Sequence, residues 1–346
     1  MLEIDGSQGE GGGQILRTAL SLACITGRPF RIANIRRGRA KPGLMPQHLM
    51  AVRAAREISA AEVTGDGTGS LELSFAPRRI VPGTFHFPIG TAGAVSLVLQ
   101  TLLPPLLLAR ERSVLTLQGG THVPFSPSIH YLSEVFLPLL GRLGGDVRLR
   151  LDACGFYPRG GGEVRCTVEP SRGFAPLSLT ERGRLLRVRG ISAVGNLPHH
   201  IAERQRQAAR ELLEERIGEE ARIAIKTSEV PTPGQGTFIF LMGEYEHAVA
   251  GFTALGARGK RAEEVGREAA EEFLAHHATG APVDPHLADQ LVLYLALARG
   301  ESRIATSRIT SHLETNLRIA GLFLPFAYRL EGERDRPGMV TIVPSP

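Results

Sequence analysis

Apolar and polar positions along this chain follow a rhythm that occurs three times. Each occurrence has an apolar helix, a short strand, a polar turn and a second helix. The first predicts a helix at residues 13–26, a strand at 30–35 and a helix from 46; the second predicts them at 93–109, 113–117 and 128; the third predicts them at 285–298, 303–306 and 311. This self-similarity indicates an internal repeat of one α/β unit.

A different pattern occupies the stretch between the second and third occurrences. It predicts strands at residues 185–194, 221–226, 237–242 and 247–252, a charged helix at 198–215 and another helix at 260–276. We therefore expect a small inserted α/β domain at 183–276 and a larger domain made of 1–182 plus 277–346. At 346 residues the chain is long enough for two domains.

The charge of the chain is mildly basic and is carried almost entirely by arginine. The net charge is +5 at pH 7, and the only lysines are Lys41, Lys226 and Lys260. Arginine suits bidentate phosphate contacts, and the same bias also arises from a G+C-rich genome, so both explanations stay open. The balance fits a nucleic-acid or nucleotide partner and leaves the fold undetermined.

Three features predict the compartment. Cys24, Cys154 and Cys166 are few, odd in number and without zinc-like spacing, which favours a reducing cytoplasm. The start of the chain lacks the basic and apolar regions of a signal peptide, so none is expected. The longest apolar run, residues 92–109, is interrupted by a glutamine and two prolines, and it predicts a buried helix rather than a membrane span.

A glycine-rich loop at residues 5–14, Asp-Gly-Ser-Gln-Gly-Glu-Gly-Gly-Gly-Gln, is the first candidate for chemistry. Its glycines allow backbone N–H groups to approach an anion at the start of the next helix, and phosphate is the obvious ligand. The loop lacks the Lys-Ser/Thr of a Walker A motif and the spacing of a dinucleotide fingerprint. Glu10 would repel phosphate unless a divalent cation such as Mg²⁺ lay between them. The alternative is a tight strand-to-helix turn.

A histidine near the C-terminus is the second candidate. His312 lies in Ser-His-Leu-Glu-Thr-Asn at 311–316, where a helix is predicted to begin. An unperturbed imidazole, with a pKa of ~6.5, is largely neutral at pH 7 and can attack an electrophilic phosphorus. The alternative is a capping or structural histidine. If the three repeats are equivalent, one cleft would receive polar residues from the turns before the second helices: Arg36, Arg39, Gln47, His48, Thr121 and His312.

Six motifs occur together and cover nearly the whole chain. They are the loop at 5–14, Gly-Arg-Ala-Lys-Pro-Gly-Leu at 38–44 with Gln-His-Leu at 47–49, Gly-Thr-Ala-Gly at 90–93 with Leu-Gln-Thr at 99–101, Gly-Phe-Tyr-Pro-Arg-Gly-Gly-Gly at 155–162, Leu-Ala-Asp-Gln-Leu at 287–291, and His-Leu-Glu-Thr-Asn at 312–316. This combination closely resembles the RNA 3′-terminal phosphate cyclase family, with the insert matching least sharply.

The resemblance implies an α/β (α+β) fold with three repeated units, each of two helices and four strands, like the C-terminal domain of translation initiation factor 3, and with an inserted small α/β domain. It implies a ligase-type enzyme that uses ATP to convert an RNA 3′-phosphate into a 2′,3′-cyclic phosphodiester, releasing AMP and diphosphate. The implied intermediates are a covalent histidine–AMP and an RNA-3′-pp-5′A end. By its position in the motif, His312 would be the nucleophile. RNA 3′-phosphate ends are the implied partner and DNA ends a second class of acceptor, with no membrane and an open oligomeric state.

The resemblance also implies roles for other residues. Glu10 would associate with Mg²⁺ or Mn²⁺. The residues implied in ATP binding are Arg17, Gln100, Pro127, Tyr131, His286, Leu287, Ala288, Asp289 and Gln290. The candidates for the RNA terminal phosphate are Arg36, Arg39, Gln47 and His48, with an exposed basic turn as the alternative. Many family members carry tyrosine where this chain has His286, whose imidazole can still stack on adenine. We interpret Arg159 and the glycines at 160–162 as a structural turn.

Three other functions compete with this interpretation. A non-catalytic, cyclase-like RNA-processing factor would keep the fold, but His312 and the intact glycine-rich loop argue against it. An enolpyruvyl transferase uses a related repeated architecture, but its sites depend on lysines and need no histidine nucleophile. A pure RNA-binding module would not require a phosphate loop with an embedded carboxylate, and aromatic residues make up only 5% of the chain.

Overall fold

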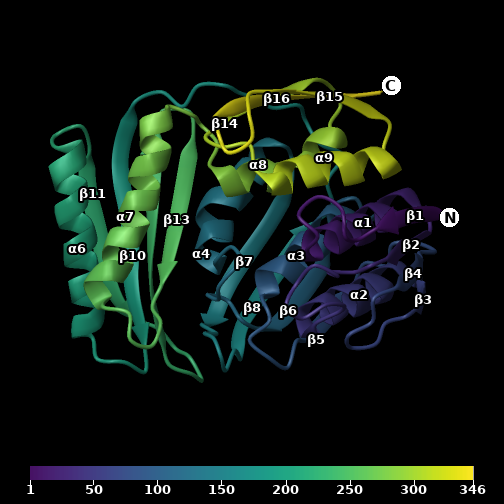
Figure 1. The fold of residues 1–346 in the computed structure, drawn as a ribbon, viewed down its shortest axis with the longest axis horizontal. Helices are drawn as coiled ribbons and strands as arrows, with labels where there is room; N and C mark the ends of the chain where they lie inside the picture. The colour runs from purple at the N-terminus through teal and green to yellow at the C-terminus, as the bar shows by residue number, and fades with distance from the viewer. Residues whose placement is uncertain (346) are drawn as a thin grey trace.

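The computed structural model describes residues 1–345, and it is built from four four-stranded sheets, each with helices packed on it (Figure 1). Three of the sheets have the same strand order and the same sequence of elements. The fourth sheet, in the predicted insert, is connected differently. The mixed α/β fold with a threefold internal repeat is therefore confirmed.

The first unit shows the pattern that the other two repeat. Its sheet has the order β1-β2-β4-β3, in which β1 and β2 are parallel and the other neighbours are antiparallel. The elements are β1 (Leu2–Asp5), α1 (Gly13–Thr26), β2 (Phe30–Ala33), α2 (Pro46–Ser59), β3 (Glu62–Thr64) and β4 (Leu73–Ala76). The predicted starts of α1 and α2 are confirmed. Pro46 opens α2, where the missing N–H of proline has no cost in hydrogen bonds.

The second unit has the sheet order β5-β6-β8-β7, but its second helix is divided into three pieces. The elements are β5 (Thr84–Pro88), α3 (Val95–Leu107), β6 (Ser113–Gly119), α4 (Ile129–Tyr131), the π-helical turn η1 (Leu132–Phe136), α5 (Leu137–Arg142), β7 (Asp146–Ala153) and β8 (Gly162–Glu169). The change of helix type falls just before Pro138, which has no N–H to donate to the carbonyl four residues earlier. The predicted apolar helix, α3, continues through its two prolines.

The third unit is split in the sequence by the insert. Its first strand is β9 (Ser178–Leu179), and the other elements follow much later: α8 (Pro285–Ala296), β14 (Ser302–Thr306), α9 (Ser311–Phe323), β15 (Phe326–Glu331) and β16 (Gly338–Pro344). The sheet order is β9-β14-β16-β15, again with one parallel pair. Pairing of β9 with β14 joins the two parts of the chain, so the repeat is complete although the insert interrupts it.

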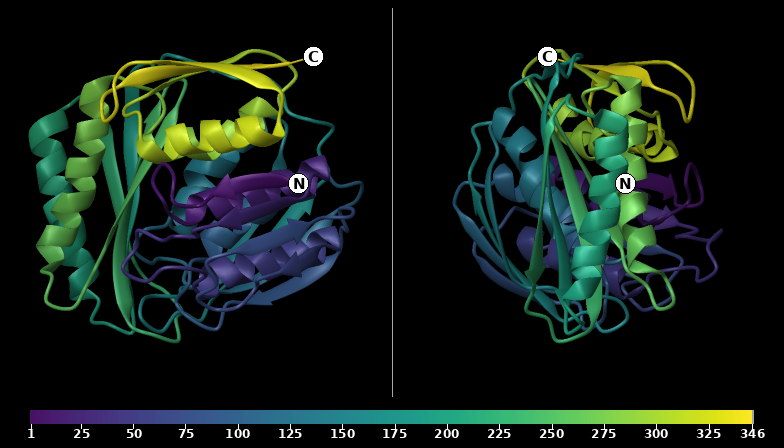
Figure 2. Two further views of the ribbon diagram at one scale, coloured as in Figure 1. Left: turned by 45° about the vertical axis from the view of Figure 1, so that its right-hand side comes forward. Right: turned by 90° about the vertical axis from the view of Figure 1, so that its left-hand side faces the viewer.

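The insert carries its own sheet, in the order β11-β10-β12-β13. Its elements are β10 (Leu185–Gly195), α6 (His200–Ile217), β11 (Arg222–Glu229), β12 (Gly236–Tyr245), β13 (Val249–Leu255) and α7 (Ala262–Thr279). Figure 1 and the right-hand view of Figure 2 show α6 and α7 side by side on one face of this sheet. The opposite face lies toward the second unit. The predicted division into domains at 183–276 stays a prediction, and α7 runs past residue 276.

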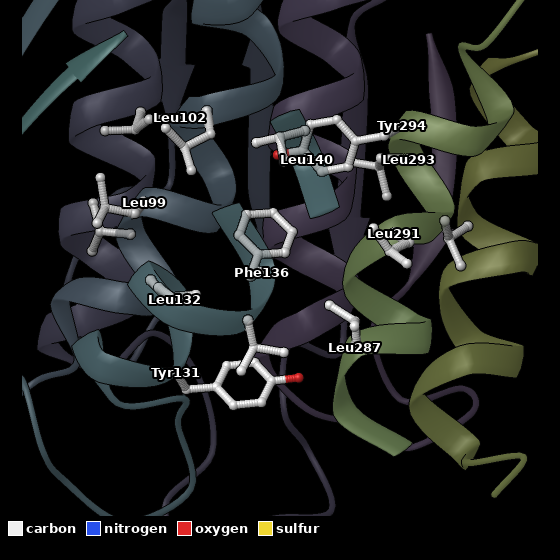
Figure 3. Close-up of a cluster of buried hydrophobic side chains, with 14 of the residues drawn as sticks. Leu99, Leu102, Tyr131, Leu132, Phe136, Leu140, Leu287, Leu291, Leu293 and Tyr294 are labelled. Carbon is white, nitrogen blue, oxygen red and sulfur yellow. The ribbon is translucent and has the colours of Figure 1, made fainter. Parts of the chain in front are cut away.

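The units are joined by a core in which helices of the second and third units meet (Figure 3). Leu99 of α3, Phe136 of η1 and Leu291 of α8 are fully buried there, and the rings of Phe136 and Tyr294 lie 5.9 Å apart. Burial of each such side chain stabilises the fold by about 1.5–3 kcal/mol. The same packing fixes where the N-termini of α8 and α9 lie. Within residues 1–345, no helix is long and apolar enough to cross a membrane.

Candidate active site

The glycine-rich loop connects β1 to α1 and lies against α9 of the third unit. The Glu10 N–H donates to Thr315 Oγ1 at 3.4 Å, which ties the loop to α9 across the sequence. A side chain at Gly13 would displace its neighbours, because a Cβ there would lie 2.3 Å from His48 Nε2 and 3.0 Å from an Arg17 nitrogen. The loop therefore brings the first unit close to the helix that carries His312.

Glu10 lies between an arginine and the candidate nucleophile. Its side chain is only 6% exposed and forms an ion pair with Arg39, whose guanidinium also donates to the Glu10 carbonyl at 2.9 Å. On the other side, Glu10 Oε2 lies 4.0 Å from His312 Nε2. The structure thus brings together the carboxylate predicted for the metal, one arginine predicted for RNA phosphate and the predicted nucleophile.

A chain of hydrogen bonds holds His312 through Gln14. Gln14 Nε2 donates to Asp289 Oδ2 at 2.9 Å, which turns the amide oxygen of Gln14 toward His312 Nδ1. Since an amide oxygen only accepts, the Nδ1 proton must point at Gln14, and Nε2 carries the free lone pair. Asn316 holds Asp289, the second partner of Gln14, by donating a hydrogen bond to the Asp289 carbonyl at 2.8 Å. The arrangement selects one imidazole tautomer with a nucleophilic Nε2.

Burial and nearby charges set the protonation states. Burial lowers the pKa of His312, Glu10 opposes this shift, and Arg17 adds to it. The imidazole, with 48% of its side chain still exposed, is therefore mainly neutral at pH 7 and reachable from solvent. Burial raises the pKa of Asp289 to about 7, although Arg17 and the Gln14 hydrogen bond oppose the rise. A neutral, accessible and oriented imidazole is what nucleophilic attack on phosphorus requires.

A small pocket, with a cavity volume of about 40 Å³, opens beside this chain of hydrogen bonds. Its lining residues come from all three units: Gln14, Arg17, Thr18, Gln100, Pro104, Phe136, Asp289, Gln290, Leu293, Tyr294 and Asn316. Burial lowers the pKa of the Arg17 guanidinium to about 10, so it stays charged at pH 7, and within residues 1–345 it has no hydrogen-bonding or ion-pair partner. Gln290 Oε1 is buried and also unpaired. A polyanion with hydrogen-bonding groups, such as a nucleotide, fits these unpaired groups.

The donor set for a metal is sparse. In the described part of the chain, no three His, Cys, Asp or Glu side chains form a cage for a metal ion. Glu10 alone lies at the mouth of the phosphate loop. Mg²⁺ commonly takes one or two protein carboxylates and fills its other positions with water and substrate phosphates. The residues therefore fit a divalent ion that arrives with a nucleotide, and they do not fit a metal held by the protein alone.

The remaining RNA-phosphate candidates lie around α2 and are partly engaged. His48 Nδ1 accepts from the Met45 N–H at 3.2 Å, while burial, with Arg17 and Arg36, lowers its pKa to about 3. Gln47 Oε1 accepts from the Ala94 N–H at 3.1 Å and so links the first unit to the second. Arg36 donates to two carbonyls of its own turn. Of the four candidates, Arg39 alone is seen beside Glu10.

Several residues implied in ATP binding lie outside the pocket. His286 is exposed in the first turn of α8, whereas the side chains of Leu287 and Ala288 belong to the core. Tyr131 is buried, and its hydroxyl donates to both oxygens of Asp284 at 2.9 Å; Asp284 is the N-cap of α8. Pro127 is half-buried in the loop before α4. Their contact with adenine stays a prediction, and the structure shows that Tyr131 helps to position α8.

One residue expected at the cleft has a structural place instead. Thr121 Oγ1 accepts from the Gly155 N–H at 2.9 Å and contacts His122 Nδ1, and the side chain is buried within the second unit. Conversely, sequence reasoning assigned no role to Gln14, Thr18 or Asn316, which the structure places in the site. Thr18 donates to Asn316 Oδ1 at 2.6 Å. The sequence held a signal for two of these residues, because Gln14 and Asn316 are the last residues of two of the quoted motifs.

Comparisons with known proteins agree on one family. A family model described as RNA 3′-terminal phosphate cyclase matches residues 8–330. Proteins of that name from Pyrobaculum neutrophilum and Nostoc punctiforme are each 46% identical, over 95% and 93% of this chain and 95% and 94% of theirs. One from Staphylothermus marinus is 44% identical over 99% of this chain and 98% of its own. Among solved structures, the enolpyruvyl transferase NikO from Streptomyces tendae covers 100% of this chain and 66% of its own at 10% identity, but its TM-score of 0.29 is too low to carry an argument.

Proposed function

Because the chain belongs to the RNA 3′-terminal phosphate cyclase family and is therefore an enzyme, we propose that it uses ATP to convert an RNA 3′-terminal phosphate into a 2′,3′-cyclic phosphodiester. His312 is the proposed nucleophile and carries AMP covalently. One observation supports this assignment above the others: a half-exposed, neutral imidazole whose Nδ1 proton is held by Gln14, so that Nε2 is free to attack.

The proposed first step transfers AMP to the enzyme. His312 Nε2 attacks the α-phosphorus of ATP; the Nε2–P bond forms, the bond to the bridging oxygen breaks, and diphosphate leaves with the bonding electrons. The imidazole becomes positively charged, and Glu10, 4.0 Å away, stabilises that charge. In this proposal Arg17 and Arg39 stabilise the charge on the leaving diphosphate. A divalent ion bound at Glu10 would neutralise the same developing charge.

The two later steps use AMP as a leaving group. An oxygen of the RNA 3′-phosphate attacks the phosphorus of histidine–AMP, the N–P bond breaks, and the imidazole returns to its neutral form. The 2′-hydroxyl oxygen then attacks the terminal RNA phosphorus, releases AMP with the bonding electrons and loses its proton to solvent. A well-oriented intramolecular attack has an effective molarity on the order of 10⁵–10⁸ M, so positioning alone accounts for ring closure and we assign no general base.

The proposed setting is a reducing cytoplasm, supported by three buried cysteines with free thiols. The main alternative function is that of a cyclase-like factor that binds RNA without adenylylation. It shares the fold, so only chemistry separates the two. An enolpyruvyl transferase is not supported, because within residues 1–345 the side chains that line the pocket include no lysine.

The test is covalent labelling with α-³²P-ATP and Mg²⁺. Wild type should carry acid-labile, alkali-stable label, and His312→Ala should carry none while it keeps its melting temperature. His200→Ala is the matched control, because His200 is an exposed histidine near the start of α6 in the insert. Label on the His312→Ala protein would refute the assignment of the nucleophile. Absence of label from folded wild type that binds ATP would favour the non-catalytic factor.

A further inference from the structure

Two aromatic side chains stay in solvent although the chain buries most of the others. Phe125 is fully exposed, and Tyr157 has 71% of its surface exposed. They lie on two loops of the second unit that are hydrogen-bonded together, since the Thr121 and His122 N–H groups donate to the Gly155 carbonyl at 2.9 and 3.2 Å. The exposed rings are therefore on neighbouring loops of one surface.

The backbone beneath these rings is held firmly. Phe156, next to Tyr157, is buried between the second unit and the insert. A Cβ at Gly236 would lie 2.1 Å from the Phe156 ring, and one at Gly195 would lie 3.1 Å from it, so glycines make the room that this anchor needs. Phe125 itself has φ of +63°, a conformation unusual for a bulky residue. The backbone at Tyr157 is thus anchored by the buried ring of Phe156, its neighbour in the chain.

The same loops lead back to the candidate active site through direct packing. A Cβ at Gly160 would lie 2.5 Å from the Thr91 carbonyl oxygen, and one at Gly93 would lie 3.0 Å from the Gln47 side chain. Gln47 precedes His48, whose ring packs on Gly13 beside Arg17. A series of packing contacts, which includes the buried His48, therefore links the phosphate loop through the 91–94 turn to the loop that carries Tyr157.

An unpaired positive charge, that of Arg159, lies two residues after Tyr157. Arg159 is exposed, and within residues 1–345 it has no ion-pair or hydrogen-bonding partner. Its stem packs on the insert, 3.3 Å from the position of a Cβ at Gly234. Aromatic faces beside a free arginine are the combination that binds single-stranded nucleic acid, because bases stack on the rings and the cation contacts phosphate.

We propose that Phe125, Tyr157 and Arg159 bind the nucleotides upstream of the RNA 3′ end by base stacking and phosphate contact. This proposal rests on the proposed function, because it assumes that the terminal phosphate lies near Arg39 and His312. The unpaired arginine beside Tyr157 favours RNA over a protein partner, because its charge complements phosphate, and packing contacts link its loop to the phosphate loop. A protein partner for the aromatic pair is the outcome that the test must separate.

The test compares a long RNA with its terminal nucleotide alone. The probes are a 5′-fluorescein ten-nucleotide RNA with a 3′-phosphate, measured by anisotropy without ATP, and uridine 3′-phosphate, measured by its displacement of that RNA. In the Phe125→Asn/Tyr157→Ser protein, the Kd of the ten-nucleotide RNA should rise about tenfold or more, while that of uridine 3′-phosphate stays unchanged. Asparagine is chosen at 125 because it tolerates positive φ. Melting temperature checks the fold.

Matched variants sharpen the result. Tyr157→Phe keeps the stacking ring and should bind like wild type, and so should Tyr328→Ser, which removes an exposed aromatic from β15 in the third unit. Arg159→Gln should lower the slope of log K against log salt by about 0.7, the share of one phosphate contact on a single strand.

Two results would overturn the proposal. Unchanged affinity of the double variant for the long RNA would assign the aromatic pair to another partner, such as a protein. Equal losses for the long RNA and for uridine 3′-phosphate would mean that the two rings act through the phosphate site. The proposed function fails separately, through absence of covalent AMP on wild type, because the binding assay uses no ATP.

Discussion

Two interfaces of this molecule each place a histidine in the first turn of a second helix, and only one of them suits catalysis. At the interface of α1 with α9, His312 contacts Gln14, lies near two carboxylates and is half exposed. At the interface of α4 with β12, His130 Nδ1 contacts His122 Nε2 at 2.8 Å and packs on Phe238, 5.0 Å away between ring centroids. No carboxylate is paired with His130 in the described residues.

The two histidines differ in the side chains that surround them, and not in residue type or in position within the repeat. Burial alone lowers the pKa of His130 to about 4, and the imidazole is therefore neutral at pH 7. No nearby charge compensates for the hydration that the protonated ring would lose. His312 is also neutral, but Glu10 opposes the shift and remains ready to stabilise the cation that nucleophilic attack creates. An internal repeat thus supplies equivalent backbone positions, and the proposed chemistry belongs to the position where a partner unit adds the carboxylate.

Removal of the Glu10 carboxylate should reduce the difference between the His312 and His130 interfaces more than any other change. Glu10→Gln should slow formation of histidine–AMP on the order of 10²–10³-fold, as loss of one oriented charge stabiliser does at other sites. It should also lower the pKa of His312 further, because Glu10 raises it. The acid limb of the rate profile would then move to lower pH. Rates of labelling across about pH 5 to 9, with Mg²⁺ titrated at each pH, measure both effects.

Glu72→Gln serves as the control for Glu10→Gln. Glu72 is likewise paired with an arginine of the first unit, Arg31, at 2.8 Å, but it lies on the exposed side of the sheet. It should leave the rate and the metal dependence as they are. An unchanged dependence on Mg²⁺ in Glu10→Gln would remove Glu10 from the site and would make the two histidine interfaces more alike than we propose.

The α4–β12 interface should respond to pH through stability and not through catalysis. The pKa of His130 is about 4 in the folded protein and ~6.5 in the unfolded chain, so between these values the unfolded chain holds more protons. The free energy of unfolding should therefore fall as pH drops from 6.5 toward 4, and His130 should account for about 2 kcal/mol of that loss at pH 5. Denaturant unfolding at pH 7 and pH 5 measures it.

His130→Gln tests this assignment with little change in shape. The amide still offers hydrogen-bonding groups to His122 Nε2, but it cannot take up the proton. The variant should lose less stability than wild type between pH 7 and pH 5, and its rate of adenylylation should match wild type at pH 7. If the acid loss keeps its full size in His130→Gln, other groups cause it; His122, whose pKa burial also lowers, is the first to examine.

Much of the fold follows from local pattern. The starts of α1, α2 and α9 and the four strands of the insert are where the rhythm of apolar positions predicts them, because side-chain periodicity is a local property. Local signals were weaker in the second unit, where Pro138 accompanies a π-helical turn that no periodicity encodes. The short strand β9 was missed for a similar reason: it has two residues and pairs with a strand more than a hundred residues later.

The candidate site was predictable in its parts and not in its connections. Glu10, Asp289 and His312 lie in motifs that could be read directly, since each motif is continuous in the sequence. Gln14 links Asp289 and His312, which lie 275 and 298 positions away from it in the sequence, and this linkage depends on how the first and third units pack. The opposite error arose at Thr121, which the repeat places in an equivalent turn but whose side chain is buried against Gly155 and His122 of its own unit.

Gln14 offers the smallest and most specific change, because its amide oxygen is the hydrogen-bonding partner that selects the tautomer of His312. Gln14→Met removes the acceptor for Nδ1–H, so the proton can move to Nε2 and block the nucleophile. Loss of one such hydrogen bond, about 1–1.5 kcal/mol, corresponds to roughly a tenfold lower rate of adenylylation with little change in the KM for ATP. Gln14→Glu keeps an oxygen facing His312 Nδ1. Asp289, with a pKa of about 7, can hold a proton between its own carboxylate and the one introduced at position 14, so that the two do not repel each other. It should therefore retain more activity than Gln14→Met. Equal rates in both variants would show that Gln14 only fills space, and His312 would then owe its reactivity to Glu10 alone.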